Sequence, residues 1–302
     1  MRIYSLLIVL LTSIMLACQK EKVTGNDSLL NYSMETISYK YMNGVDPNLL
    51  SLDIYFDAHK RDLKPVVVWV HGGGWCKGDK SNKMENKKRL FASLGYLLVS
   101  VNYRLSPYPY EINNPQRIKF PIHNIDLADA LKRIQDNIDD YGGNPRQIVL
   151  MGHSAGAHLV ALTCTNQHYL LQSGFDPSNI KGVAIIDTRM YDVYHSIQEI
   201  ANPPALYLNA FGDDPQENLD TSPIRNLHNH YFPKFFVAKR GNTERLRAAN
   251  EFISALQQNH IDVVSLEAYD YSHSEINDAI GMENENVITP ALISFLNVCF
   301  ED

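Results

Sequence analysis

The feature that most constrains the fold of this 302-residue chain is the sequence Gly-His-Ser-Ala-Gly at residues 152–156. It directly follows an apolar run at residues 147–151 and leads into a second apolar run at residues 157–162. A strand, a sharp turn and a helix in immediate succession form a nucleophile elbow, which lifts a serine hydroxyl above the edge of a sheet. The turn strains the serine backbone, and glycine two residues to either side avoids a steric clash. The pattern predicts Ser154 as a nucleophile.

A second glycine-rich segment, His-Gly-Gly-Gly-Trp at residues 71–75, follows a valine-rich run that is short enough to be a buried strand. Consecutive glycines leave backbone N–H groups unshielded by side chains. Hydrolysis of an ester or amide passes through a tetrahedral oxyanion, and preorganised N–H donors that face this oxygen are usually the largest catalytic contribution. We therefore predict an oxyanion hole formed by the N–H groups of Gly73, Gly74 and Ala155.

Three segments together point to a family: residues 71–75, Asn-Tyr-Arg-Leu-Ser-Pro at residues 102–107, and residues 152–159. They resemble the α/β-hydrolase esterases of the hormone-sensitive-lipase-like kind. The tryptophan after the glycines and Gly-Asp-Lys at residues 78–80 are most similar to the bacterial feruloyl-esterase and kynurenine-formamidase branch. The resemblance spans about residue 36 to the C-terminus. It implies the fold and acyl hydrolysis, and it is much less specific for the substrate.

The serine needs a base to remove its proton. In the family that the chain resembles, the order along the sequence is nucleophile, acid, histidine, with the histidine in a loop after the last strand. His273 matches this place, because it follows a strand predicted to end near Tyr269. We therefore expect His273 to be the catalytic base.

The catalytic acid is the point at which this sequence departs from the family. Most relatives have aspartate in a turn after the penultimate strand, where this chain has Glu244, the only carboxylate between Lys239 and Arg245. A carboxylate near the ring N–H would orient the histidine. Alternatively, Glu244 is a helix-start charge favoured by the helix dipole, and the acid is Asp187, at the end of the preceding strand.

Strands and helices alternate along the rest of the chain, which predicts an α/β-hydrolase fold with a mostly parallel central sheet and helices on both faces. Residues 36–42 and 50–56 are expected to form an antiparallel N-terminal hairpin. Thr289 is expected to cap a last helix at residues 291–300. A polar stretch at about residues 191–232 is long for a connection, and we interpret it as a possible cap insertion over the site.

The N-terminus has the charged start and apolar core of a secretory signal. It ends in a sequence that resembles a bacterial lipobox, with Cys18 as the lipidated residue. We expect residues 1–17 to be a lipoprotein signal peptide, residues 18–32 a polar tether, and residues 33–302 the catalytic domain. The acyl chains would hold the protein at a membrane of the bacterial cell envelope, with outer-membrane sorting favoured and the periplasmic or surface face left open.

Composition excludes some partners. The net charge is −7 and no basic tract occurs, which argues against nucleic acid as a partner. Three cysteines remain once Cys18 is assigned to lipid, and no Cys/His spacing suggests zinc. Neither a metal nor an organic cofactor is needed for the predicted chemistry.

These features predict a serine carboxylic-ester hydrolase that acts through an acyl-enzyme, on small acyl, acetyl or feruloyl esters linked to carbohydrate. One alternative is an arylformamidase or other amidase of the same fold. The other is a catalytically silent hydrolase fold that serves only for binding.

Overall fold

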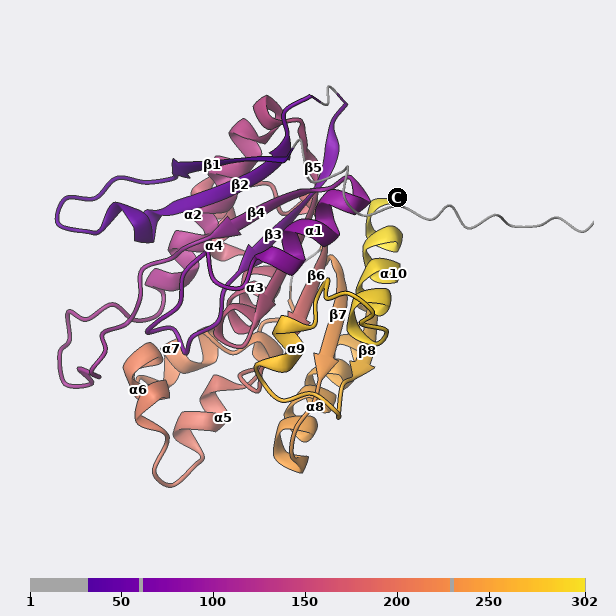
Figure 1. Cartoon of the computed structure of the whole chain (residues 1–302). Helices are drawn as coiled ribbons and strands as arrows, with labels where there is room; N and C mark the ends of the chain where they lie inside the picture. The colour runs from indigo at the N-terminus through magenta and orange to yellow at the C-terminus, as the bar shows by residue number, and fades with distance from the viewer. Residues whose placement is uncertain (1–31, 60–61, 229–230, 302) are drawn as a thin grey trace, which may run out of the picture.

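The structure, a computed structural model, describes residues 32–59, 62–228 and 231–301. Within these residues the chain forms one eight-stranded sheet in the order β1-β2-β4-β3-β5-β6-β7-β8 (Figure 1). β2 pairs antiparallel with both β1 and β4, and the remaining neighbours are parallel. The strands are β1 (Tyr32–Ser38), β2 (Ser51–Asp57), β3 (Lys64–Val70), β4 (Leu97–Val101), β5 (Gly143–His153), β6 (Ile180–Ile186), β7 (Lys234–Lys239) and β8 (Val263–Glu267). The predicted fold class, with its antiparallel N-terminal hairpin, is confirmed.

Helices cover both faces of the sheet (Figure 1). One face packs against α2 (Ile122–Asn137), α3 (Ala155–Thr165) and α8 (Thr243–Gln258), and the other against α1 (Glu85–Leu94) and α10 (Ile288–Phe300). Because both faces are covered, the central parallel strands β3, β4, β5 and β6 contain buried, largely apolar runs without alternation. Shorter helices are α4 (His168–Ser173), α5 (Val193–Gln198), α6 (Ala205–Phe211), α7 (Pro215–Asp220) and α9 (Glu275–Asp278).

The carboxyl ends of the parallel strands face the segment at residues 191–232. This segment contains α5, α6 and α7, which lie beyond the edge of the sheet, beside the long connection from β4 to α2 (Figure 1). Ligands of open α/β sheets bind at this edge. The segment therefore borders the place where a site is expected.

The last helix begins differently from the sequence prediction. Glu285 accepts hydrogen bonds from the backbone N–H groups of Val287, Ile288 and Thr289, at 2.7, 2.9 and 2.6 Å. The Thr289 hydroxyl instead accepts from the N–H of Gly281 at 2.9 Å. The prediction that Thr289 caps the helix is wrong, because a glutamate four residues earlier reaches the same free N–H groups.

The predicted signal peptide, the lipidation site Cys18 and all of the tether except Tyr32 lie outside the described residues. Lipidation stays a prediction. No described helix has the length and apolar character that crossing a membrane requires. The three cysteines after Cys18 are buried: Cys76, Cys164 and Cys299.

Candidate active site

Ser154 lies in a sharp turn between β5 and α3, with φ 56° and ψ −115°. A Cβ atom on Gly152 would come within 2.4 Å of the Gly156 backbone, and one on Gly156 within 2.1 Å of the Val70 carbonyl oxygen. The Ser154 N–H donates to the carbonyl oxygen of Ile186 at 3.0 Å, which ties the turn to the end of β6. Only glycine fits on either side, so the chain has the geometry of the predicted elbow.

His273 lies in the loop between β8 and α9, where the sequence places it. Its Nε2 is 2.9 Å from the Ser154 hydroxyl oxygen, and its Nδ1 is 2.6 Å from the Asp187 carboxylate. An N–H on Nδ1 that donates to Asp187 leaves Nε2 free to accept the serine proton. The three side chains therefore form a serine, histidine and carboxylate chain of hydrogen bonds.

Asp187 directly follows β6 and is 2 % exposed. Arg240 and Arg245 each contact its carboxylate at 2.5 Å. Burial alone would raise the pKa of Asp187, but the hydrogen bond from His273 and the charge of Arg245 hold it well below its usual range. Asp187 is therefore an anion at neutral pH and favours a protonated His273 when one forms.

Glu244 does not contact His273, so the prediction that it orients the histidine is wrong. Its carboxylate is paired with Arg189 at 2.7 Å and its side chain is 50 % exposed. Glu244 lies in the first turn of α8, where Asn242 provides the N-cap, and an acidic side chain there is favoured by the helix dipole. The next residue, Arg245, turns inward to Asp187. Asp187, the alternative acid that follows β6, instead lies next to His273.

His153, the second residue of the elbow motif, makes a contact with His273 that the sequence does not predict. Its Nε2 donates to the carbonyl oxygen of His273 at 2.8 Å, and the two rings lie 4.5 Å apart between centroids. Burial and the neighbouring His273 lower the pKa of His153 to about 4. At neutral pH, His153 is therefore uncharged and holds the backbone of His273 through this hydrogen bond.

The glycine loop after β3 turns sharply beside the elbow. Gly73, Gly74 and Trp75 have φ values of 123°, 60° and 59°, and a Cβ on Gly73 would overlap the Lys77 carbonyl oxygen. Neither Gly73 nor Gly74 donates its N–H to another described residue. Ala155 begins α3, so its N–H lies at the positive end of a helix. These are the donors that an oxyanion hole needs.

The base of this loop is held by aromatic side chains. The His71 ring stacks on Tyr103 with 4.6 Å between centroids, and the Tyr103 hydroxyl donates to the His71 carbonyl oxygen at 3.1 Å. The His71 Nδ1 donates to the carbonyl oxygen of Gly72 at 2.8 Å. These three contacts order the glycine loop through His71.

The group of metal-ligating side chains among the described residues coincides with this site. Ligand atoms of His153, Asp187 and His273 lie within 4.8 Å of one another. The hydrogen bonds that join His153 to His273 and His273 to Asp187 account for this close spacing. Arg240 and Arg245 already neutralise Asp187, so a metal cation there would meet positive charge.

A buried lysine connects α1 to α9, the helix that follows His273. Lys87 is 1 % exposed, and its Nζ donates to the carbonyl oxygens of Asn277 at 3.0 Å and Lys83 at 3.3 Å. The same ammonium lies 4.4 Å from the centroid of the Trp69 ring. Lys83 also pairs with Asp278 at 2.6 Å. Helix α1 thus holds the segment just after the histidine.

We expect this burial to make stability depend on pH. Burial lowers the pKa of Lys87 from 10.5 to about 7, although Asp278 opposes the shift. Between these values the unfolded chain binds more protons than the folded one, so Lys87 makes the free energy of unfolding rise with pH by up to about 1.4 kcal/mol per unit. Urea unfolding at pH 7, 8 and 9 should show this rise in the wild type relative to Lys87→Met. A difference between the two proteins that does not change with pH would refute the assignment.

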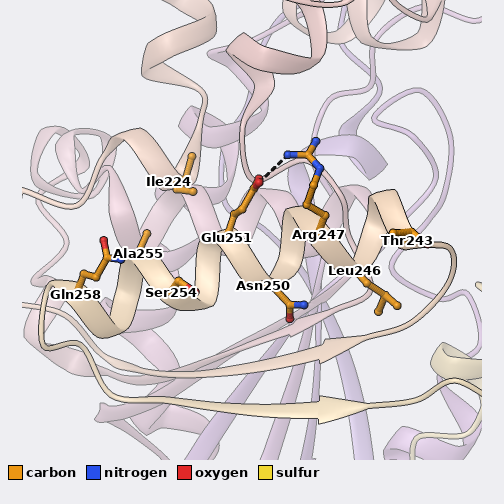
Figure 2. Close-up of a pocket in the computed structure, with 9 residues that line it drawn as sticks. All are labelled: Ile224, Thr243, Leu246, Arg247, Asn250, Glu251, Ser254, Ala255 and Gln258. Carbon is orange, nitrogen blue, oxygen red and sulfur yellow. Dashed lines mark hydrogen bonds and ion pairs between the residues drawn. The ribbon is translucent and has the colours of Figure 1, made fainter.

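A separate hollow of about 700 Å³ runs along the outer side of α8 (Figure 2). An ion pair between Arg247 and Glu251 crosses it at 2.6 Å. None of its lining residues belongs to the chain of Ser154, His273 and Asp187. This hollow is therefore not the substrate site.

Comparison with known proteins assigns the family. The BD-FAE family model matches residues 52–228, a segment that includes the glycine loop, the elbow and Asp187. The chain belongs to the BD-FAE family. The predicted resemblance to α/β-hydrolase esterases is confirmed.

Several proteins similar to this chain are described as esterases. The chain is 26% identical to esterase LipQ of Mycobacterium tuberculosis over 89% of its own length and 63% of that protein. It is 33% identical to carboxylesterase 1E of Rattus norvegicus over 48% of this chain and 26% of that one. The BD-FAE chain thus spans less than two thirds of the length of these relatives.

Solved structures share the fold at low identity. Esterase B of Lactobacillus rhamnosis matches with a TM-score of 0.70 and 19% identity, over 89% of this chain and 85% of that one. A truncated carbohydrate esterase from gut microbiota matches with a TM-score of 0.70 and 14% identity, over 90% of this chain and 98% of that one.

Proposed function

We propose that this BD-FAE protein is a serine carboxylic-ester hydrolase that acts through an acyl-enzyme. The observation that carries the proposal is the continuous chain of hydrogen bonds from the Ser154 hydroxyl through His273 to Asp187. This chain ends beside backbone N–H groups of the glycine loop that have no partner among the described residues. A nucleophile, an oriented base and an oxyanion site are the parts that acyl transfer needs.

In the first half of the reaction, Ser154 attacks the ester carbonyl carbon while His273 Nε2 takes the hydroxyl proton. The carbonyl oxygen becomes an anion that the N–H groups of Gly73, Gly74 and Ala155 stabilise. The intermediate collapses, the C–O bond to the alcohol breaks, and His273 gives its proton to the leaving alcohol.

In the second half, His273 takes a proton from water, and the resulting hydroxide attacks the acyl-enzyme carbonyl. Collapse of the second intermediate releases the carboxylic acid and returns the proton to Ser154. Asp187 stays ionised throughout, because it stabilises the imidazolium in each half without accepting its proton.

The substrate that we propose is an acyl group, acetyl or feruloyl, on a carbohydrate. Support comes from the resemblance to the feruloyl-esterase branch and from the predicted attachment of the protein to the cell envelope, where polymeric carbohydrate is encountered. A structural neighbour described as a carbohydrate esterase is in keeping with this choice.

Parallel measurement of kcat/KM on p-nitrophenyl acetate, methyl ferulate and N-formylkynurenine tests the proposed reaction. We expect hydrolysis of at least one ester with a kcat/KM that exceeds the value for the formamide. Preference for N-formylkynurenine would contradict an esterase and favour the arylformamidase alternative. Absence of any turnover would favour the silent binding protein.

A further inference from the structure

We propose that Tyr108 and Tyr110 form a binding site for a sugar ring in the alcohol part of the substrate. We call this pair the tyrosine platform. The inference rests on the proposed ester hydrolysis, because it names the part of the substrate that lies outside the reacting bond.

The two rings are exposed although they are large and largely apolar. Tyr108 is 64% exposed and Tyr110 is 40% exposed. Their centroids lie 5.6 Å apart in an edge-to-face arrangement at 74°. Neighbouring exposed aromatic side chains leave an apolar surface in water, and such a surface is typical of a binding site.

The tyrosine platform adjoins the glycine loop. The Lys77 ammonium lies 4.9 Å from the centroid of the Tyr108 ring. The backbone N–H of Lys77 donates to the Gly73 carbonyl oxygen at 3.1 Å. Just before the platform in the sequence, the N–H of Ser106 donates to the carbonyl oxygen of Trp75, which follows the glycines, at 2.8 Å. A group bound on the platform would therefore lie at the edge of the oxyanion site.

The segment that carries the rings is held in place at both ends. Asn209 of α6 is fully buried; its side chain donates to the Pro107 carbonyl oxygen at 3.0 Å and accepts from the N–H of Glu111 at 3.1 Å. Arg117 donates to the Asn209 carbonyl oxygen at 3.1 Å. These bonds bracket the tyrosines in the sequence. The rings are thus preorganised, which lowers the entropic cost of binding.

The surroundings of the platform favour a sugar over an aromatic group. A hollow of about 380 Å³ continues along the same segment, where Ile112, Pro115 and Leu208 lie among polar side chains that include Asn113, Asp213 and the ion pair of Lys119 with Glu217. A pyranose has one face of C–H groups, which contact the negative face of an aromatic ring, and hydroxyl groups around its edge. The amide of Asn113 and the carboxylate of Asp213 can hydrogen-bond those hydroxyls, whereas a feruloyl ring would desolvate them without replacing their hydrogen bonds to water.

Kinetics on three esters test the tyrosine platform: acetylated xylotetraose, ethyl acetate and methyl ferulate. In Tyr108→Ala and Tyr110→Ala, we expect kcat/KM for acetylated xylotetraose to fall by about tenfold or more, equivalent to about 1.4 kcal/mol. For ethyl acetate and methyl ferulate, kcat/KM should change by less than about twofold. Tyr108→Phe should retain the wild-type value, since it keeps the ring. Tyr41→Ala, which removes a tyrosine that is 83% exposed, is the matched control.

Other patterns overturn the proposal. A loss confined to methyl ferulate would make the platform a site for aromatic groups, and equal losses or no loss on all three esters would remove its role in sugar binding.

A second measurement is independent of catalysis: unmodified xylotetraose should bind Ser154→Ala, detected by saturation-transfer NMR, and binding should disappear in Ser154→Ala/Tyr108→Ala. Failure of xylotetraose to bind would refute the platform even if the esterase is active. Binding without any ester turnover would refute only the proposed reaction.

Discussion

Replacement of Ser154 by alanine is expected to lower kcat for p-nitrophenyl acetate by about 10⁶-fold, the loss typical of removing the nucleophile of a serine hydrolase. Alanine lacks the hydroxyl that attacks the ester, and no other described hydroxyl lies within hydrogen-bond distance of His273. Its Cβ meets the same strain as serine at φ 56°, so the fold should not change. Steady-state kinetics on the purified domain, with circular dichroism and thermal unfolding as controls, give this value.

A nearby serine provides the matched control. Ser272 precedes the histidine, and its hydroxyl accepts from the N–H of Glu275, away from the Ser154 hydroxyl. Ser272→Ala should keep kcat within about threefold of wild type, as expected of most substitutions that do not touch reacting groups. Retention of substantial activity in Ser154→Ala would exclude Ser154 as the nucleophile.

Replacement of Asp187 by asparagine is expected to lower kcat by about 10⁴-fold, as the equivalent change does in a serine protease. An asparagine amide stabilises the wrong histidine tautomer and gives no charge to support the imidazolium. Because the change also leaves Arg240 and Arg245 without their shared anion, some loss of thermal stability should accompany it. The kinetic measurement is therefore made well below the unfolding temperature of the variant.

Glu244→Gln is the matched control for the acid. It removes a carboxylate at the start of α8 that is paired only with Arg189 among the described residues. Surface ion pairs of this kind contribute about 0–1 kcal/mol, so stability and kcat should change little. A larger loss of kcat in Glu244→Gln than in Asp187→Asn would reverse the assignment of the acid.

The elbow and the fold could be predicted because their signals are local. Glycines at residues 152 and 156 flank Ser154 in the sequence, and apolar runs of strand length indicate a sheet covered on both faces. His273 was also predictable, because its place after the last strand follows from the order of elements. Each of these features can therefore be recognised from a short stretch of sequence or from the order of the elements.

The acid could not be chosen from the sequence because two neighbouring strands both offer a carboxylate at their carboxyl ends. What separates them is the direction of side chains. Asn242 caps α8 and Glu244 then faces outward, whereas Asp187, at φ 47°, faces His273 between two arginines. The contact from His153 to the His273 backbone spans 120 residues, and no local pattern signals it.

Covalent labelling with a fluorophosphonate, followed by mass spectrometry of the peptides, tests the central claim most directly. The reagent reacts with a serine that a neighbouring base has activated, whatever the natural substrate is. We expect an adduct on Ser154 that is absent from Ser154→Ala and forms far more slowly in His273→Ala. An adduct on another residue, or an unlabelled folded protein, would contradict a hydrolase built on Ser154, His273 and Asp187.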